Sequence, residues 1–197
     1  MQKQKGKKTQ KKIIDAAVKC LSEKGVHQTT FQMIADESGI SQPLIMHYFK
    51  KKEDIFPVVW NHIYEDAVIE TAKRLKSNLT PVEKLREYFL VSWDLFYVNK
   101  DLTKIYIQFY FLSAFDEKLK AENSLVKRTA INRIASIIIE GQNKNYFNLQ
   151  LNPHSMAKII HISLSGFILN HVSEFVEFEY SLLLDHFFET ILLKLKK

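Results

Sequence analysis

The sequence predicts an all-α protein of about nine helices. Hydrophobic residues make up 46% of the 197 positions, which is enough to build a packed core and argues against disorder. Only five glycines and four prolines occur, so long helices can run without interruption. Apolar residues recur at helical spacing, and no regular strand alternation stands out. These three observations together favour helices throughout.

The N-terminal elements begin with a polar, lysine-rich arm over residues 1–8, which we expect to be mobile. A first helix follows over about residues 8–24, with Ile13, Ala17 and Leu21 on its inner face. Gly25 is the expected stop, since glycine often ends a helix in the left-handed conformation.

Two short helices joined by a tight turn are predicted within about residues 30–49. Thr29 and Gln32 have the spacing of a capping box at a helix start. Gly39 falls where the chain leaves that helix in a left-handed conformation. Ser41 can cap the next helix, and Pro43 is tolerated in its first turn. This order of elements is the outline of a helix-turn-helix.

The second of these short helices has an apolar face and an outward face. Ile40, Ile45 and Phe49 can point into a small core. Their positions leave Gln42, Leu44, Met46 and His47 largely outward.

The remaining helices are expected at about residues 51–76, 81–98, 101–115, 119–142, 153–175 and 179–194. Pro57 falls about two turns inside the first of them, where it should bend the axis. Thr80, Pro81 and Glu83 form a strong helix start, with a cap, an N1 proline and an N3 acid. Pro153 opens the helix over 153–175 in the same way.

The net positive charge of the chain comes from its N-terminal region. Residues 1–52 hold 11 Lys and Arg against 4 Asp and Glu, a net charge of +7, whereas residues 53–197 hold 17 against 18. Basic charge on one face is typical of a surface that binds phosphates. The alternative is a solvated basic tail that only aids solubility.

The order of short motifs in this region is specific. The motifs are Ile13-Ile14-Asp15-Ala16-Ala17, Glu23-Lys24-Gly25, Thr29-Thr30, Ile34-Ala35, Ser38-Gly39-Ile40-Ser41 and Phe49-Lys50-Lys51-Lys52-Glu53-Asp54-Ile55. This order resembles the N-terminal domain of the TetR family of transcriptional regulators, over roughly the first third of the chain. The resemblance implies a helix-turn-helix DNA-binding domain over 7–67, joined through the fourth helix to a helical ligand-binding and dimerisation domain over 68–197.

The resemblance also implies which residues contact DNA. They are Thr29, Thr30, Ser41, Gln42, Pro43, Leu44, Met46, His47, Tyr48 and Lys52. The two threonines and Lys52 should meet phosphates. Gln42 is the best base reader, because a carboxamide pairs with the major-groove edge of adenine, while Pro43 and Leu44 can pack on thymine methyls. Met46 stands where the family usually has a tyrosine, so His47 or Tyr48 must supply that phosphate contact.

Aromatic residues are abundant in the larger domain. Members of the resembled family enclose a ligand cavity there, and an aromatic lining suits a flat or apolar small molecule. The expected lining residues are Trp60, Tyr64, Phe89, Trp93, Phe96, Phe109 and Tyr110. The alternative for each of them is an ordinary place in the core.

The last two predicted helices are apolar nearly all round, although a helix needs only one apolar stripe for its own core. A second copy of the chain is the expected partner for the other face, in a four-helix interface. The expected interface residues are Phe167, His171, Phe187, Phe188, Ile191 and Leu192. The alternative is that both faces pack within one chain.

Several classes of protein are disfavoured by the sequence. The single cysteine, Cys20, excludes an internal disulfide framework and fits a reducing cytoplasm. The charged N-terminus lacks the apolar segment of a signal peptide, and no apolar run is long enough to span a membrane. No zinc-ligand spacing, phosphate loop or nucleophile motif occurs, so we expect no metal site, no cofactor and no enzyme activity.

The sequence therefore predicts a cytoplasmic, homodimeric, sequence-specific DNA-binding transcriptional regulator. The expected partners are double-stranded operator DNA, a second copy of the chain and a small-molecule effector. An apolar or aromatic ligand should release it from DNA as a repressor, with the bend at Pro57 as the lever. The alternatives are a helix-turn-helix adaptor without a ligand, and a small α-helical enzyme.

Overall fold

The computed structural model describes residues 2–171 and 179–196, and within them the chain is all-α. The predicted end of the eighth helix, near Phe175, lies outside the described residues. The described helices are α1 (Gln2–Gln28), α2 (Phe31–Ser38), α3 (Gln42–Tyr48), α4 (Ile55–Arg74), α5 (Pro81–Trp93), α6 (Lys100–Leu112), α7 (Glu117–Asn143), α8 (Pro153–His171) and α9 (Tyr180–Leu195). The predicted fold class is confirmed.

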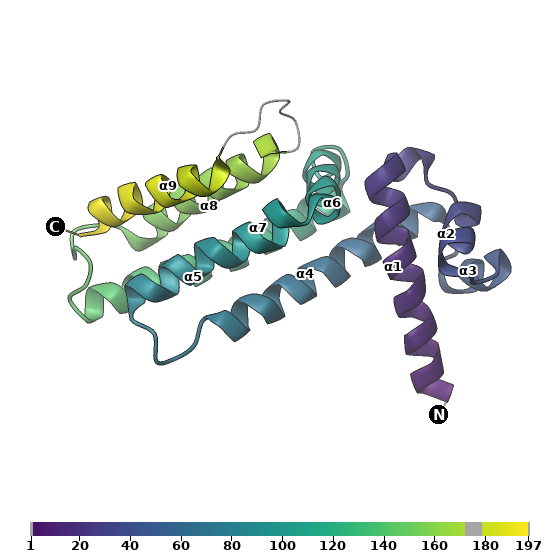
Figure 1. Cartoon of the computed structure of the whole chain (residues 1–197), viewed down its shortest axis with the longest axis horizontal. Coiled ribbons are helices and arrows are strands. Elements are labelled where there is room, and N and C mark those ends of the chain that lie inside the picture. The colour runs from purple at the N-terminus through teal and green to yellow at the C-terminus, as the bar shows by residue number, and fades with distance from the viewer. Residues whose placement is uncertain (1, 172–178, 197) are drawn as a thin grey trace.

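The molecule is elongated, with α1, α2 and α3 at one end (Figure 1). We call this end, together with the 3₁₀ turn at Lys52–Asp54, the head. Helix α4 leads away from the head, and α5 and α7 run alongside it (Figure 1). The neighbouring α8 and α9 form one edge of the molecule, and α6 lies between the head and the other helices.

Two predicted helix boundaries are formed by local hydrogen bonds. The Thr80 hydroxyl oxygen accepts the Glu83 N–H at 3.3 Å, and the Glu83 carboxylate accepts the Thr80 N–H at 2.7 Å, which completes the predicted capping box. Gly39 has φ 66° and donates its N–H to the Ala35 carbonyl at 2.9 Å. The predicted left-handed turn between the two short helices is therefore present.

Helix α1 is longer than expected at both ends. Residues 2–8 are helical, so the predicted helix start near residue 8 was wrong, while the mobility of this arm stays a prediction. Gly25 does interrupt the helix, with φ 75° and ψ 168°, but helical residues continue to Gln28 beyond this kink. Gln108 of α6 bridges the kink, because its side-chain oxygen accepts the Val26 N–H at 2.9 Å and its nitrogen donates to the Leu21 carbonyl at 3.0 Å.

The N-cap of α2 is Thr30 rather than Thr29. The Thr30 hydroxyl accepts the Met33 N–H at 3.2 Å. The side chain of Thr29 instead points into the end of α1, so the predicted pairing of Thr29 with Gln32 was wrong. Both threonines have the side chain that a cap needs, and tertiary packing of the helix before them decides which one caps.

Helix α4 starts later than expected, at Ile55, after the 3₁₀ turn. Pro57 therefore lies in the first turn of α4, where N–H groups have no acceptor within the helix. The predicted bend two turns inside the helix has no physical basis at this position. Helix α5 also ends early, at Trp93, and a π-helical turn follows over Asp94–Val98.

The buried apolar residues form two clusters. One joins the head to α4, α6 and the start of α7, and contains Trp60, Ile105, Phe109 and Leu119 together with the core of α1, α2 and α3. The other joins α5, α7, α8 and α9. The head thus shares its core with α6, since one long and two short helices bury too little apolar surface alone. The proposed division at residues 67/68 stays a prediction, and this core extends across it.

A paired glycine substitution tests the second cluster. A Cβ atom on Gly141 of α7 would overlap the ring of Phe147, which is 3% exposed. Gly141→Ala should therefore lower the free energy of unfolding by about 1–3 kcal/mol, the usual cost of overpacking. Gly6→Ala is the matched control, because its Cβ would lie 3.8 Å from the Tyr48 hydroxyl, an ordinary contact. Denaturant unfolding of the two variants should separate them, and equal stability would contradict this packing.

Candidate nucleic-acid interface and ligand cavity

Helix α3 presents a mixed apolar and polar surface at the end of the molecule. Ile45 is fully buried and Phe49 is 4% exposed, so they anchor the helix to the head as predicted. On the outer side, Leu44 is 41% and Met46 is 48% exposed. Ser41, Pro43 and His47 are also exposed, and Gln42 is half-buried. Exposed apolar side chains on a short, well-anchored helix leave this face available to a partner.

The two threonines before α2 have different environments. Thr29 is 1% exposed, and its hydroxyl donates to the Gly25 carbonyl at 2.8 Å or the Cys20 carbonyl at 3.2 Å. A buried, satisfied hydroxyl does not reach a phosphate, so the predicted phosphate contact of the Thr29 side chain was wrong. Thr30 is exposed, at the N-terminus of α2. Helix N-termini favour anions, so Thr30 alone keeps the predicted role.

Two other predicted contact residues also hold the head together. The Lys52 ammonium donates to the His27 carbonyl at 2.7 Å, in the last turn of α1. The Tyr48 hydroxyl is 3.4 Å from the Gly6 carbonyl, near the start of the same helix. Both contacts fix α3 and the following turn against α1. Phosphate binding by Lys52 remains a prediction, since its remaining N–H groups are free to donate.

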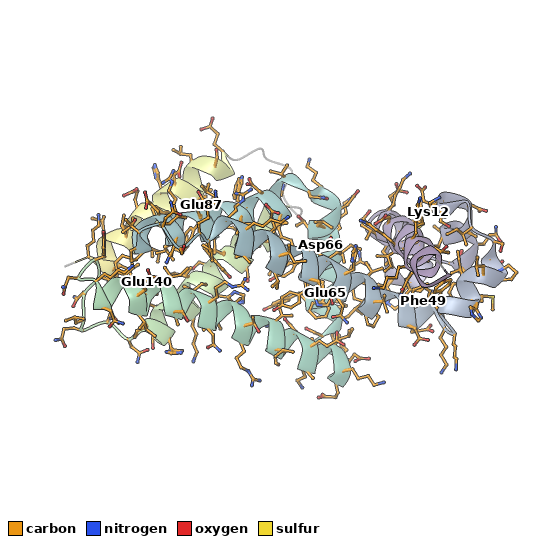
Figure 2. The ribbon with its side chains drawn as sticks, turned by 90° about the horizontal axis from the view of Figure 1, so that it is seen from below. Lys12, Phe49, Glu65, Asp66, Glu87 and Glu140 are labelled. Carbon is orange, nitrogen blue, oxygen red and sulfur yellow. The ribbon has the colours of Figure 1, made fainter. Side chains whose placement is uncertain are left out.

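The positive charges of the head are distributed along α1 and after α3. Lys7, Lys8, Lys11 and Lys12 are exposed on α1, and Lys50 and Lys51 are exposed beyond α3. Figure 2 shows Lys12 and Phe49 at the head, with Glu65 and Asp66 on α4 and with Glu87 and Glu140 farther along the molecule. The charge separation seen in the sequence is therefore also a separation in space.

A cavity of about 110 Å³ lies between the two apolar clusters. Helices α4, α5, α6, α7 and α8 and the π-helical turn all contribute to its wall. The lining residues are Trp60, Tyr64, Ala67, Val68, Thr71, Tyr88, Ser92, Leu95, Phe96, Tyr106, Val126, Thr129, Ala130, Arg133, His161, Leu164, Ser165 and Ile168. The π-helical turn supplies Leu95 and Phe96, and such turns are frequent at functional sites.

Three of the seven predicted pocket residues line this cavity, namely Trp60, Tyr64 and Phe96. The other four predictions were wrong for this cavity. Phe109 is buried behind Trp60, with the two rings stacked at 3.9 Å between centroids. Phe89 packs on the aromatic rings of α9, and Trp93 lines a separate small space beside α8. Tyr110 is 38% exposed and lies under the Lys127 ammonium.

Four functional candidates in the wall were missed by the sequence reasoning. They are Tyr88, Tyr106, Arg133 and His161. Val126, Thr129, Ala130 and Arg133 follow one helical face of α7, so an arginine within an otherwise small and apolar stripe was a signal that could have been found.

The polar groups of the wall are desolvated. Burial raises the pKa of Tyr88 to about 12, and the charge of Arg133 opposes this shift. Burial, and secondarily the Lys127 charge, lower the pKa of His161 below its ordinary value, so the imidazole is neutral. The Tyr106 hydroxyl donates to the Ser165 hydroxyl at 3.2 Å. Within the described residues, Trp60 Nε1 and His161 Nε2 are buried and lack hydrogen-bond partners.

Several residues of α9 that were predicted to lie at the dimer interface are instead buried within the single chain. Phe188, Ile191 and Leu192 are at most 8% exposed within the single chain, so their assignment to a dimer interface was wrong. Phe167, His171 and Phe187 are half-buried, and the Phe167 and Phe187 rings are 5.5 Å apart. The exposed large apolar residues of the two helices are Ile159, Ile162, Leu182, Leu183 and Leu193.

No helix among residues 2–171 and 179–196 combines the length and the apolar composition needed to cross a bilayer.

Most of the head is similar to a known protein family. Residues 13–59 match the family model described as bacterial regulatory proteins of the tetR family. The HTH-type transcriptional regulator BetI of Burkholderia ambifaria is 27% identical over 109 residues, which are 55% of this chain and 56% of that protein. The BetI protein of Paraburkholderia phymatum is 25% identical over the same shares. The chain thus spans about half the length of the curated relatives it matches.

Solved structures of regulators match the whole fold. The FadR regulator of Bacillus subtilis, in complex with stearoyl-CoA, has a TM-score of 0.80 and 21% identity, over 93% of this chain and 98% of that one. A transcriptional regulator of Saccharomonospora viridis, in complex with choline, has a TM-score of 0.82 and 17% identity, over 94% of each chain. A TetR transcription regulator of Haloarcula marismortui has a TM-score of 0.78 and 17% identity, over 95% and 94%. At these identities the likeness establishes the fold.

The buried imidazole in the cavity wall makes stability depend on pH. In the unfolded chain His161 binds a proton near its ordinary pKa of 6.5, whereas in the folded protein it does so only at lower pH. Its contribution to stability is therefore present above pH 6.5 and is lost as the pH falls through the folded pKa. Below pH 6.5 the free energy of unfolding should therefore fall less steeply with decreasing pH in His161→Gln than in the wild type. Denaturant titrations at several pH values measure this slope. His154→Gln, exposed on α8, is the control, and an unchanged slope in His161→Gln would refute this assignment.

Proposed function

We propose that the chain is a member of the tetR family of bacterial regulatory proteins, which its residues 13–59 match, and that it is a sequence-specific DNA-binding regulator controlled by a small molecule. The head binds operator DNA, and the cavity between the two apolar clusters binds the ligand. The protein acts as a repressor that the ligand releases from DNA.

The observation that carries this proposal is the exposed face of α3. Ile45 and Phe49 hold the helix rigidly, and Gln42, Leu44 and Met46 project from a surface surrounded by lysines. A helix of this kind fits the major groove, where side chains near its N-terminus reach base edges. Phosphate contacts from Thr30, Lys52 and the lysines of α1 set the register on the duplex.

The ligand controls DNA binding through the core that the head shares with α4 and α6. Trp60 forms part of the cavity wall and stacks on Phe109, whose helix carries Gln108 against the kink of α1. A ligand that prefers one arrangement of these helices shifts the position of the head by its differential affinity. These contacts, rather than a bend at Pro57, would connect the cavity to the head.

Ligand binding by neighbours of the same fold supports the cavity's role, since two of them are complexes with stearoyl-CoA and choline. The second candidate is a DNA-binding adaptor without a ligand. The volume of about 110 Å³ favours it, because most ligand pockets are larger, at roughly 300–1,000 Å³. An operator affinity that no cavity ligand alters would select the adaptor.

Dimerisation completes the proposal. The face formed by Ile159, Ile162, Leu182, Leu183 and Leu193 carries the apolar side chains that a second copy would cover. Two heads related by a two-fold axis require a palindromic operator, with half-sites about one helical turn or slightly more apart. Selection of bound duplexes from a random pool tests this function, and recovery of no common sequence would contradict it.

Two substitutions in the head should separate base reading from phosphate binding. Gln42→Ala should relax preference at one base pair by about 1–3 kcal/mol, because it removes a bidentate base contact. Lys52→Ala should weaken all duplexes alike and reduce the salt dependence by about one released ion. Affinity is measured for the selected operator and its single-base variants over a range of salt concentrations. Identical behaviour of the two variants, with equal melting temperatures, would refute the division of roles.

Neighbouring leucines of α9 test the dimer. Leu193 is 76% exposed, so Leu193→Glu should give a folded monomer. Leu192 is 8% exposed within its own chain, so Leu192→Glu should lower the unfolding free energy by placing a charge in the core. Light scattering reports the mass and thermal unfolding reports the stability. The face has another role if the wild-type chain is monomeric at micromolar concentration, or if Leu193→Glu keeps the wild-type mass.

A further inference from the structure

We propose that the cavity binds a small monocarboxylate whose apolar body is about the size of a single aromatic ring, with the carboxylate paired to Arg133. This inference rests on the proposed function only in taking the cavity as a ligand site. The inference specifies the charge and the size of the ligand and the protein residue that binds its carboxylate.

The lining residues of the cavity include a positive charge but no negative charge. Arg133 is its one formally charged residue, and no aspartate or glutamate is among the lining residues. Among the described residues, Arg133 forms no ion pair with an acidic side chain. The acids of α7 on either side have other influences: Glu140, seven residues further on, pairs with Lys84 and Lys144. The pKa of Glu122 is raised by burial and by Asp116. The guanidinium therefore lacks a counter-charge that an anionic ligand would supply.

The positive field continues beyond Arg133. Lys127 lies before Arg133 on α7. Its charge contributes to lowering the pKa of His161, a residue of the cavity wall. Arg133 and Tyr88 both line the cavity, and the charge of Arg133 opposes the rise that burial causes in the pKa of Tyr88. Two cations beside a desolvated space favour an anion there and disfavour a cation.

Two residues that line the cavity each have a buried nitrogen atom without a hydrogen-bond partner among the described residues. Trp60 is 1% exposed, and its Nε1–H, which can only donate, has no acceptor among the described residues. The neutral His161 imidazole likewise has a buried, unpaired Nε2. An unpaired buried donor such as the Trp60 Nε1–H costs stability, and an acceptor on a ligand would restore its hydrogen bond. Carboxylate oxygens can accept hydrogen bonds from Arg133 and from this N–H together.

The size and the remaining lining define the body of the ligand. An apolar cavity of roughly 150 Å³ accommodates a benzene ring in another protein, so a volume of about 110 Å³ fits one ring or a short branched chain. Phe96, Tyr64 and Tyr106 supply aromatic surface for that body. Aromatic rings alone would also suit an organic cation by cation–π attraction, but Arg133 opposes a positive ligand at this place.

Three probes of equal shape and different charge test the proposal. Benzoate, benzamide and benzamidinium are titrated by calorimetry into the full-length protein without DNA. Benzoate should bind about tenfold or more tightly than benzamide, as expected for a desolvated, charge-assisted contact, and benzamidinium should bind most weakly. Pentanoate and pentanamide repeat the comparison for an aliphatic body.

Variants assign the preference to the arginine. Arg133→Met should bind benzoate no better than benzamide, while its benzamide affinity shows that the cavity remains folded. Arg133→Lys should keep part of the preference, and Arg128→Met, on the exposed side of α7, should keep all of it. The proposal is overturned if benzamide or benzamidinium matches benzoate, if the preference survives in Arg133→Met, or if no probe binds at millimolar concentration. Because no DNA is present, a failure of operator control leaves these results unaffected.

Discussion

The stacked pair of Trp60 and Phe109 is the contact on which the rest of the architecture depends. The two rings lie 3.9 Å apart and nearly parallel, and they join α4 to α6 inside the cluster that also holds the head. Large aromatic side chains bury more apolar surface than any others, so this pair stabilises the shared core strongly. The outer side of the indole forms cavity wall. One side chain thus belongs both to the core of the head and to the proposed ligand site.

A few polar groups in the mostly apolar cavity wall are buried at a cost in stability. Trp60 Nε1 and His161 Nε2 are desolvated without partners among the described residues, and burial raises the pKa of Tyr88 to about 12. Apolar side chains of similar volume would stabilise the fold more. Polar groups kept in this state are a feature of binding sites, where a ligand restores the missing hydrogen bonds. The proposed coupling to the head would pass through Gln108, which contacts both sides of the α1 kink.

Features fixed by local hydrogen bonds could be predicted from the sequence, and features fixed by packing could not. The capping box of Thr80 and the left-handed Gly39 depend on residues within four positions, and both predictions are confirmed. Thr29 and Thr30 are equivalent as sequence, and only the burial of Thr29 against α1 distinguishes them. Pro57 was misplaced because the 3₁₀ turn shifts the start of α4. The wall of the cavity comes from five helices and a π-helical turn, so composition identified its aromatic character while missing Arg133.

We expect the cavity and the head to be energetically coupled through the core that they share. The most direct measurement is operator affinity as a function of the concentration of a cavity-bound probe, in the wild-type protein and in Gln108→Ala. Saturation of the cavity should weaken operator binding by about 5–150-fold in the wild type, a coupling of about 1–3 kcal/mol. The weakening should be smaller in Gln108→Ala. A probe that saturates the cavity by calorimetry and leaves wild-type operator affinity unchanged would contradict this coupling.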